Sequence, residues 1–422
     1  MSRSRDVRRW VGSLLLLWTV ALWLSVASQQ PALSPAPCPR CGWTPPGTVA
    51  VQHVRSVSEL YRAVGGARGA TTILLADGEY MLDRMLDVQT PGTVIRGASG
   101  DPSKVVLRGA GMTEGQVGVA LSISTQDVTI ADLTIGYVGF HGIQVRGERG
   151  ASRVMIHDVR IVDTGQQLIK GSTDGGTLHA DEGIVACSTL EYSDRAPGNY
   201  TNAVDVLAGN DWIVRDNTIR RIRGVAAEGG ASGPAILFWA NSQGTKVERN
   251  IVIDSFRGIA FGLGPGASGR FARDHEAFYD HQGGWIRNNV VVNLNRWADE
   301  GIEANAAGTV AIDHNTVLTQ GTLPWAISAR FPGTIAFARN NLMSKPLIRR
   351  NGGQASVGGN VPTAASDWFV DAAHENLALN GTNLTAVDAG VPLADINEDA
   401  SRQPRTQGKA PDAGAFEYRG PR

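Results

Sequence analysis

The residues of this sequence that can carry out chemistry include one lysine and several carboxylates near the middle of the chain. Lys170 is followed by Asp181, Glu182 and Asp205. Carboxylate oxygens are ligands that Ca2+ prefers, and a bound cation helps a neighbouring lysine to lose its proton and act as a base. We expect Lys170 and Asp205 to be catalytic, and Asp181, Glu182 and Asp205 to bind Ca2+. The alternative is a Lys–Asp ion pair on a solvated face.

A second group of ionisable residues lies later in the chain. His275 stands in a charged segment, residues 273–276, and Arg330 follows it at a distance. An imidazole can remove a proton near neutral pH, and a guanidinium can neutralise a carboxylate through two parallel hydrogen bonds. We expect His275 and Arg330 to take part in catalysis. The alternative for the segment around His275 is an exposed charged loop.

Aromatic and polar residues around these groups are candidates for binding sugar. Trp239 follows an apolar strand, PAILF, and a tryptophan that faces out of a sheet needs a loop or a ligand to cover it. Tyr200 either stacks on sugar or anchors its own loop. The residues that we expect to bind substrate are Arg146, Tyr200, Trp239, Glu303 and Asn305.

All these residues lie in a part of the sequence that consists of repeats of one short unit. The unit is an apolar residue, two variable residues, Asn or Asp, two variable residues and an apolar residue, followed by a turn and a Gly/Ala-Ile-x-apolar segment. It runs from TIADLTI to FARNNLM, with the aligned copies 25 to 39 residues apart. The fourth residues of the copies are Asp132, Asp158, Cys187, Asn217, Asn250, Asn289, Asn315 and Asn340.

The repeat predicts an all-β fold. Each unit contains short segments with period-2 alternation and no helical stretch, and one such strand cannot bury its face unless copies stack on it. A period near 25 residues is the length of one coil of a parallel β-helix, and asparagine in the bend tolerates a left-handed backbone and bonds to the coils above and below. We therefore predict a single-stranded parallel β-helix of about 8–10 coils.

The remaining segments give the organisation of the chain. Residues 1–28 combine arginines with an apolar run and predict a signal peptide or signal anchor, so the protein is expected to be exported, with membrane contact only through an uncleaved segment. We predict a Pro-rich linker at 29–46, an N-terminal cap at 47–92 with a short helix near Val57–Val64, the β-helix at 93–365 and an irregular C-terminal cap at 366–422 that closes the stack.

Charge and cysteine content exclude several classes of protein. The chain has 39 basic and 40 acidic residues, a net charge of -1, so nucleic acid is not an expected partner. Three cysteines exclude a disulfide scaffold and a four-cysteine zinc site. A local disulfide between Cys38 and Cys41 is the simplest expectation, and a capped solenoid is expected to be monomeric.

Alternation along the Gly/Ala-Ile-x-apolar strands assigns their faces. The inward ladder that we predict is Ile143, Ile169, Val204, Ile236, Ile259, Ile302, Ile327 and Ile348. The outward row is Gln144, Lys170, Asp205, Leu237, Ala260, Glu303, Ser328 and Arg349, and the next outward row includes Arg146, Trp239, Asn305, Arg330 and Asn351. A slip of one residue would exchange the inward and outward sets.

The chain resembles the secreted right-handed parallel β-helix proteins of the pectin-lyase-like superfamily. The resemblance rests on TTILLADGEY, the asparagine ladder, TVIRGASGDPSKVVLRGAGM and the C-terminal stretch that ends in DAGAFEY. It implies a right-handed β-helix and a polysaccharide that lies along the sheet of the Gly/Ala-Ile-x-apolar strands. The superfamily contains lyases, hydrolases, epimerases and adhesins, so the resemblance does not select a reaction.

The function that we predict is cleavage of a uronate-containing glycan by β-elimination. A cation neutralises the uronate, a base removes the C5 proton, and a further group protonates the leaving oxygen. The alternative is a carbohydrate-binding or cell-surface β-helix without catalysis. A third possibility, a glycoside hydrolase, needs two carboxylates on neighbouring coils, such as Asp205 with Asp181 or Glu182. Asp205 and Glu303, which are about 14 Å apart by strand spacing, do not form such a pair.

Overall fold

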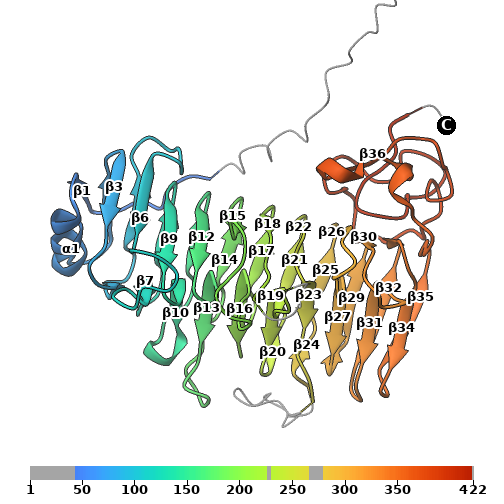
Figure 1. Ribbon diagram of the computed structural model, residues 1–422, viewed down its shortest axis with the longest axis horizontal. Coiled ribbons are helices and arrows are strands. Elements are labelled where there is room, and N and C mark those ends of the chain that lie inside the picture. The colour runs from blue at the N-terminus through green and yellow to red at the C-terminus, as the bar shows by residue number, and fades with distance from the viewer. Residues whose placement is uncertain (1–42, 226–229, 266–278, 421–422) are drawn as a thin grey trace, which may run out of the picture. The chain divides into compact units, whose positions relative to one another are not determined.

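The computed structural model describes residues 43–225, 230–265 and 279–420, and its described part consists of stacked coils of parallel strands (Figure 1). Each full coil contributes one strand to each of three long sheets, here named A, B and C, and every pairing within them is parallel. The predicted fold class, a single-stranded parallel β-helix, is confirmed.

Sheet A has twelve strands and is the longest of the three. Its strands are β1 (Ala50–Val54), β2 (Thr71–Leu75), β5 (Val94–Gly97), β8 (Thr129–Ala131), β11 (Met155–His157), β14 (Ile184–Ala186), β17 (Ile213–Arg215), β21 (Lys246–Glu248), β25 (Trp285–Arg287), β29 (Val310–Asp313), β32 (Ile335–Arg339) and β35 (Gln354–Gly358).

Sheet B follows sheet A after a tight bend in each coil, and it has ten strands. They are β3 (Gly78–Met81), β6 (Val105–Arg108), β9 (Thr134–Val138), β12 (Arg160–Thr164), β15 (Thr189–Glu191), β18 (Thr218–Arg220), β22 (Ile251–Ile253), β26 (Val290–Asn293), β30 (Thr316–Thr319) and β33 (Leu342–Met343).

Sheet C, also of ten strands, is formed by the Gly/Ala-Ile-x-apolar segments. They are β4 (Leu86–Val88), β7 (Val119–Ile123), β10 (His141–Arg146), β13 (Ile169–Ser172), β16 (Val204–Leu207), β19 (Pro234–Trp239), β23 (Arg257–Phe261), β27 (Ile302–Asn305), β31 (Ile327–Arg330) and β34 (Leu347–Arg350).

Shorter elements complete the described part. A small parallel sheet joins β20 (Ser242–Gln243), β24 (His281–Gln282) and β28 (Ala307–Gly308), and β36 (Phe369–Asp371) pairs antiparallel with β37 (Asn376–Leu379). The 3-10 helices are η1 (Gly147–Arg149), η2 (Ser366–Trp368) and η3 (Ala372–His374).

The helix α1 (Val57–Gly66) begins at a capping box, formed by Ser56 and Glu59 of a Ser-x-x-Glu sequence. The Ser56 side chain accepts a hydrogen bond from the Glu59 backbone N–H, and the Glu59 carboxylate accepts one from the Arg55 backbone N–H at 2.7 Å. Leu60, Ala63 and Val64 are buried, because this face of the helix covers the apolar residues of the first coil. The helix ends two residues later than predicted.

Isoleucine and valine side chains fill the interior of sheet C in register. Ile143, Ile169, Val204, Ile236, Ile259, Ile302 and Ile327 are successive strand partners, as predicted. The last prediction is wrong by one residue: Leu347 pairs with Ile327, and Ile348 pairs with the outward Ser328. Arg350, not Asn351, therefore pairs with Arg330. Arg349 does not stand in the outward row in which it was predicted.

The asparagine ladder lies inside the bend between sheets A and B. Its rungs are Asn217, Asn250, Asn289, Asn315, Asn341 and Asn360, and each amide donates to the carbonyl oxygen of the next amide at 2.9–3.0 Å. The alignment of the repeats is wrong by one residue at four positions. Asp132, Asp158, Cys187 and Asn340 do not stand in the rung position but directly before it, where the backbone has a positive φ.

The C-terminal tail packs along the side of the stack, over the outward face of sheet B, rather than as the predicted closure of its end. Trp368, Phe369, Leu377 and Tyr418 form one apolar cluster with outward side chains of sheet B, including Val292. In Figure 1 the tail lies beside β26 and β30. Burial of apolar area on both surfaces stabilises this arrangement.

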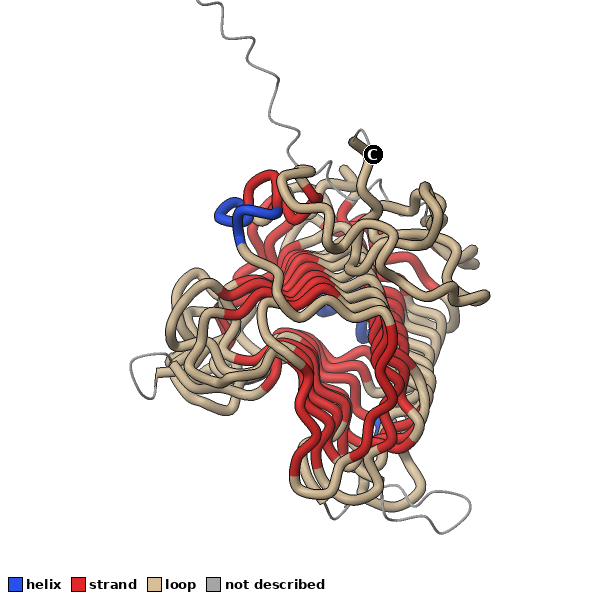
Figure 2. Tube along the Cα trace, turned by 90° about the vertical axis from the view of Figure 1, so that its right-hand side faces the viewer, coloured by secondary structure: helices blue, strands red, loops and turns tan. Residues whose placement is uncertain are grey.

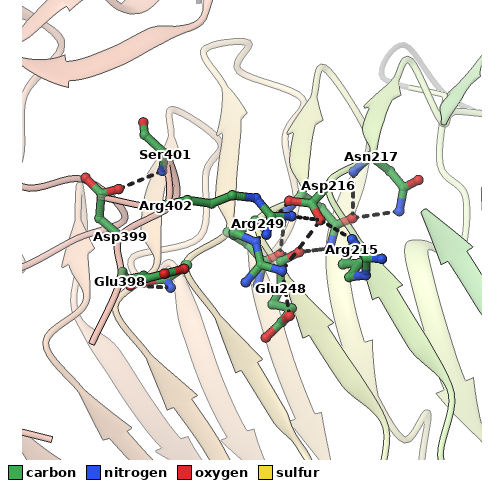
Figure 3. Close-up of polar contacts among 12 residues, drawn as sticks. Arg215, Asp216, Asn217, Glu248, Arg249, Glu398, Asp399, Ser401 and Arg402 are labelled. Carbon is green, nitrogen blue, oxygen red and sulfur yellow. Dashed lines mark hydrogen bonds and ion pairs between the residues drawn. The ribbon is translucent and has the colours of Figure 1, made fainter. Parts of the chain in front are cut away.

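A buried carboxylate also joins the tail to the bend of the coils (Figure 3). Asp216, 5% exposed, accepts from Arg402 of the tail at 2.7 Å, from Arg215 at 2.8 Å and from Arg249 of the next coil at 2.9 Å. Because three guanidinium groups share this carboxylate, its burial is compensated by charge-assisted hydrogen bonds.

Cys187 forms a disulfide. Cys38 and Cys41, for which a local disulfide is predicted, lie outside the described residues, as does the predicted signal segment. At the beginning of the described part, the Trp43 ring stacks on His157 with the ring centroids 5.2 Å apart. No helix within the described ranges is long and apolar enough to cross a membrane.

We predict that Asn289→Ala lowers the free energy of unfolding by about 3 kcal/mol. The Asn289 amide donates to Val247 and Asn315, and its oxygen accepts from Asn250, so the substitution leaves buried polar groups without partners. Urea unfolding of the two proteins measures the difference. The matched control, Asn397→Ala at an exposed position, should change it by less than about 0.5 kcal/mol. Equal effects of the two substitutions would contradict the role of the ladder.

We predict that stability falls as the pH drops from about 6.5 to 4. Burial lowers the pKa of His281 to about 3 and that of His314 to about 2, with nearby Arg405 also lowering the latter. In this range the unfolded state binds more protons than the folded state, so each histidine adds up to about 1.4 kcal/mol per pH unit to the slope. Thermal unfolding between pH 4 and 8 should show a shallower slope for His281→Leu than for the wild type. Identical slopes would show that His281 is not the titrating group.

Candidate functional site

The longest connections of the described coils flank sheet C. Residues 173–183 follow β13, residues 192–203 precede β16 and residues 294–301 precede β27, whereas two residues join β14 to β15. Figure 2, which looks along the stack, shows the loops gathered at the corners of the coil. Insertions beside one sheet are the usual place of binding residues on a solenoid.

The first charged group on the outward face of sheet C is an ion pair. Lys170 and Asp205 are direct partners on β13 and β16, as predicted from the repeat. The Lys170 Nζ lies 2.6 Å from the Asp205 Oδ2, and Asp205 has no exposed surface. Burial in low dielectric strengthens the attraction between the two groups, so the ammonium is held in one position.

Two aromatic residues complete this group. Lys170 Nζ also donates to the Tyr200 hydroxyl at 2.8 Å, and the Trp239 indole N–H donates to Asp205 Oδ1 at 2.8 Å. Tyr200 is 52% exposed, whereas Lys170 is 8% exposed. We name Lys170, Tyr200, Asp205 and Trp239 the Lys170 cluster. Its surface towards solvent consists mainly of the tyrosine, which is the group best placed to meet a ligand.

A neutral histidine lies near the Lys170 cluster. His141 begins β10, and burial, together with the charge of Lys170, lowers its pKa to about 4. Its imidazole is therefore uncharged at neutral pH. His141 was not among the predicted site residues, because a single histidine at the start of a strand forms no motif with other residues at a characteristic spacing.

The carboxylates predicted to bind Ca2+ are not brought together. Asp181 accepts a hydrogen bond from the Asn210 backbone N–H at 2.9 Å, Glu182 stands exposed in a bend with positive φ, and both oxygens of Asp205 face donors of the Lys170 cluster. Within residues 43–225, 230–265 and 279–420, no group of three His, Cys, Asp or Glu side chains is arranged to hold a metal ion. These residues therefore do not fit a preformed calcium site.

A second charged group lies further along the same outward face. Glu303 on β27 stands in the row of Lys170 and Asp205, and Glu300 precedes it in the connection. Both are 3% exposed. Burial, and then the charge of Glu303, raises the pKa of Glu300 to about 7. Two close carboxylates in a buried place cannot easily both be ionised, so Glu300 holds a proton over part of the neutral range.

Arginines surround these two carboxylates. Arg257 bonds to Asp299 at 2.6 Å and lies 3.7 Å from Glu303, while Arg350 bonds to Glu300 at 2.8 Å. Asn305 donates to Glu303 at 2.9 Å and is the strand partner of Arg330. We name Arg257, Glu300, Glu303, Asn305, Arg330 and Arg350 the Glu303 cluster.

Two predicted site residues lie elsewhere. Arg146 donates to Ser122 at 2.8 Å and lies 3.4 Å from Glu148, so local partners near the start of the stack hold it. His275 and its charged segment lie outside the described residues. The sequence analysis missed Glu300 and Arg350 as site residues. Arg350 was missed because the register predicted for the last coil was wrong by one residue. Glu300 was missed because it precedes its strand, where alternation does not indicate which way a side chain points.

Comparison with known proteins identifies the fold. No protein-family model matches the chain, and no curated protein matches it significantly. The solved structure of pectate lyase Pel9A is similar with a TM-score of 0.59 at 14% identity, over 88% of this chain and 97% of the lyase. The structure of XylC with xylose is similar with a TM-score of 0.51 at 11% identity, over 74% of this chain and 75% of XylC. The resemblance in fold inferred from the sequence is thereby confirmed.

We predict that Glu300→Gln changes the pH dependence of stability. Since the folded protein raises the pKa of Glu300 from 4.5 to about 7, ionisation disfavours folding, and wild-type stability loses this contribution as the pH rises through that range. Glutamine cannot ionise. The melting temperature of Glu300→Gln relative to the wild type should therefore rise between pH 4.5 and 7 and then level off. A difference that does not depend on pH would contradict the raised pKa.

Proposed function

We propose that the protein acts on a polysaccharide that lies along the outward face of sheet C, and that it cleaves a uronate-containing glycan by β-elimination. The observation that supports this most directly is the Lys170 cluster, in which a half-exposed tyrosine is hydrogen-bonded through its hydroxyl to a buried ammonium. The long connections on both sides of sheet C and the fold that the chain shares with pectate lyase Pel9A agree with a glycan as substrate.

The arrangement suggests a division of roles. Tyr200 exchanges protons with the substrate, because it is the half-exposed residue of the cluster and its polar group is the hydroxyl. Lys170 stabilises negative charge on the tyrosine oxygen, so we assign it the support of the base rather than the role of the base itself. Asp205 keeps the ammonium in place, and the Trp239 ring, oriented through its bond to Asp205, offers a face for a sugar.

The proposed reaction conserves atoms and electrons. Tyr200 reacts as its phenolate, its hydroxyl proton having passed to solvent: the phenolate oxygen takes the proton from C5 of the uronate, the electron pair of that C–H bond forms the C4–C5 double bond, and the C4–O bond breaks. Tyr200 then gives the same proton to the leaving oxygen, which restores the phenolate. No step of this scheme uses a metal ion, since the predicted calcium ligands are not assembled in the described residues.

A non-catalytic carbohydrate-binding function is the second candidate. It is favoured by one observation: both oxygens of Asp205 and the Lys170 ammonium already have partners, as in a structural ion pair. In that case Tyr200 and Trp239 would hold sugar without chemistry. The two candidates differ in what removal of the tyrosine hydroxyl does, because a binding protein does not require a proton-transfer group.

We predict that Tyr200→Phe and Lys170→Met each lower kcat on a polyuronate by about 100-fold or more, with a much smaller change in KM, because each removes part of the proton-transfer pair. The assay follows the ultraviolet absorbance of the unsaturated uronate with polygalacturonate, alginate, glucuronan and glycosaminoglycans. Tyr61→Phe, on α1, is the matched control and should leave kcat unchanged.

Three outcomes of this assay decide between the candidates. Equal activity of Tyr200→Phe and the wild type would overturn the assignment of the base. Absence of absorbing product with every polymer, together with retained binding, would favour the carbohydrate-binding candidate. A parallel series with chelator tests the predicted requirement for Ca2+, and loss of product there would mean that a cation site is assembled only with substrate.

A further inference from the structure

The Glu303 cluster contains one guanidinium, that of Arg330, that makes no ion pair with the residues that the structure describes. Arg257 and Arg350 each have a close carboxylate, at 2.6 and 2.8 Å. For Arg330, the residues that the structure describes supply no ion pair, and its Nε is buried without a hydrogen-bond acceptor. Desolvation, and then the charge of Arg350, lower the pKa of Arg330, and the nearby charges of Glu303 and Glu300 offset this only in part. An unpaired buried donor costs free energy that a ligand with a negative group can recover.

Acceptor atoms without donors lie beside this arginine. Glu303 Oε1 and Asn305 Oδ1 are buried, and neither has a hydrogen-bond donor in the described part of the chain. The ion pair between Glu303 and Arg257, at 3.7 Å, is longer than a hydrogen bond. Because Asn305 is the strand partner of Arg330 and bonds to Glu303, the three side chains share one place on the outward face.

We propose that Glu303, Asn305 and Arg330 form a second saccharide subsite, which binds an acidic sugar unit through its carboxylate on Arg330 and its hydroxyl groups on Glu303 and Asn305. A sugar hydroxyl can donate to the two unpaired acceptors, and a carboxylate matches the planar guanidinium. One acidic sugar therefore supplies both kinds of partner that these buried atoms lack.

This inference rests on the proposed function, and the position of the subsite predicts how binding depends on the length of the glycan. Glu303 stands four strands along sheet C from Lys170, a separation of about 19 Å at the usual spacing of neighbouring strands. A glycan long enough to reach both clusters binds through both, whereas a short glycan binds through one. Occupation of two subsites by one chain raises its affinity above that for either subsite alone. The protein should therefore prefer long acidic chains.

The test measures binding, not cleavage. Calorimetric titrations use oligosaccharides of galacturonate, mannuronate, guluronate and glucuronate, from dimer to octamer, with xylo-oligosaccharides as neutral probes, and Tyr200→Phe as the common background. Arg330→Gln should weaken binding of the long acidic oligosaccharides by at least about tenfold and abolish the gain of affinity with length. The matched control is Arg349→Gln, which should leave binding unchanged, because Arg349 is an exposed arginine on β34, the strand that pairs with the strand of Arg330.

Other results would overturn the proposal. Unchanged binding by Arg330→Gln would show that Arg330 meets no ligand, and equal affinity for xylo-oligosaccharides would show that the subsite does not select an acidic sugar. Failure of the background protein to bind any of the four uronates would exclude the carboxylate. Failure of the lyase proposal is distinguished from these results, since it gives no ultraviolet-absorbing product from the wild type while length-dependent binding through Arg330 persists.

Discussion

The register in which successive coils stack is the constraint on which the rest of the structure depends. Parallel backbone hydrogen bonds fix it within each sheet, and the amide ladder from Asn217 to Asn360 continues it through the bend, where the backbone alone would leave polar groups unpaired. Because each coil lies directly on the previous one, residues far apart in the sequence become neighbours at strand spacing. Lys170 and Asp205 meet for this reason, and so do Asn305 and Arg330.

Burial of charge on the outward face of sheet C gives the candidate site its character. Charged groups that water does not reach need partners in neighbouring coils. The low dielectric strengthens the attraction within each pair, and it raises the free-energy cost of each buried group that has no partner. In the Lys170 cluster the described partners satisfy the ammonium and the carboxylate, and Tyr200 is the half-exposed residue. In the Glu303 cluster a donor and two acceptors have no described partner. The first arrangement suits chemistry at one exposed atom, and the second suits recognition.

The three sheets of the described part differ in what covers or flanks them. The C-terminal tail covers the outward face of sheet B through an apolar cluster and through the shared carboxylate of Asp216. Tight bends join sheet A to sheet B, and the long described connections stand at the edges of sheet C. Side chains of sheet C are therefore the ones that loops can enclose.

The sequence by itself determined the class of fold, the strands of sheet C, the capping box of α1 and the pairing of Lys170 with Asp205, because periodicity and alternation are local signals that stacking repeats coil by coil. It did not determine the register of the last coil or the rungs of the ladder, since consecutive isoleucine or asparagine candidates allow a slip of one residue. Only the tertiary structure decided that Cys187 is in a disulfide, that the tail lies over sheet B, and that Asp181 and Glu182 stay apart from Asp205. Glu300 acquires its raised pKa in the same way, because burial and the charge of a neighbour exist only in the folded chain.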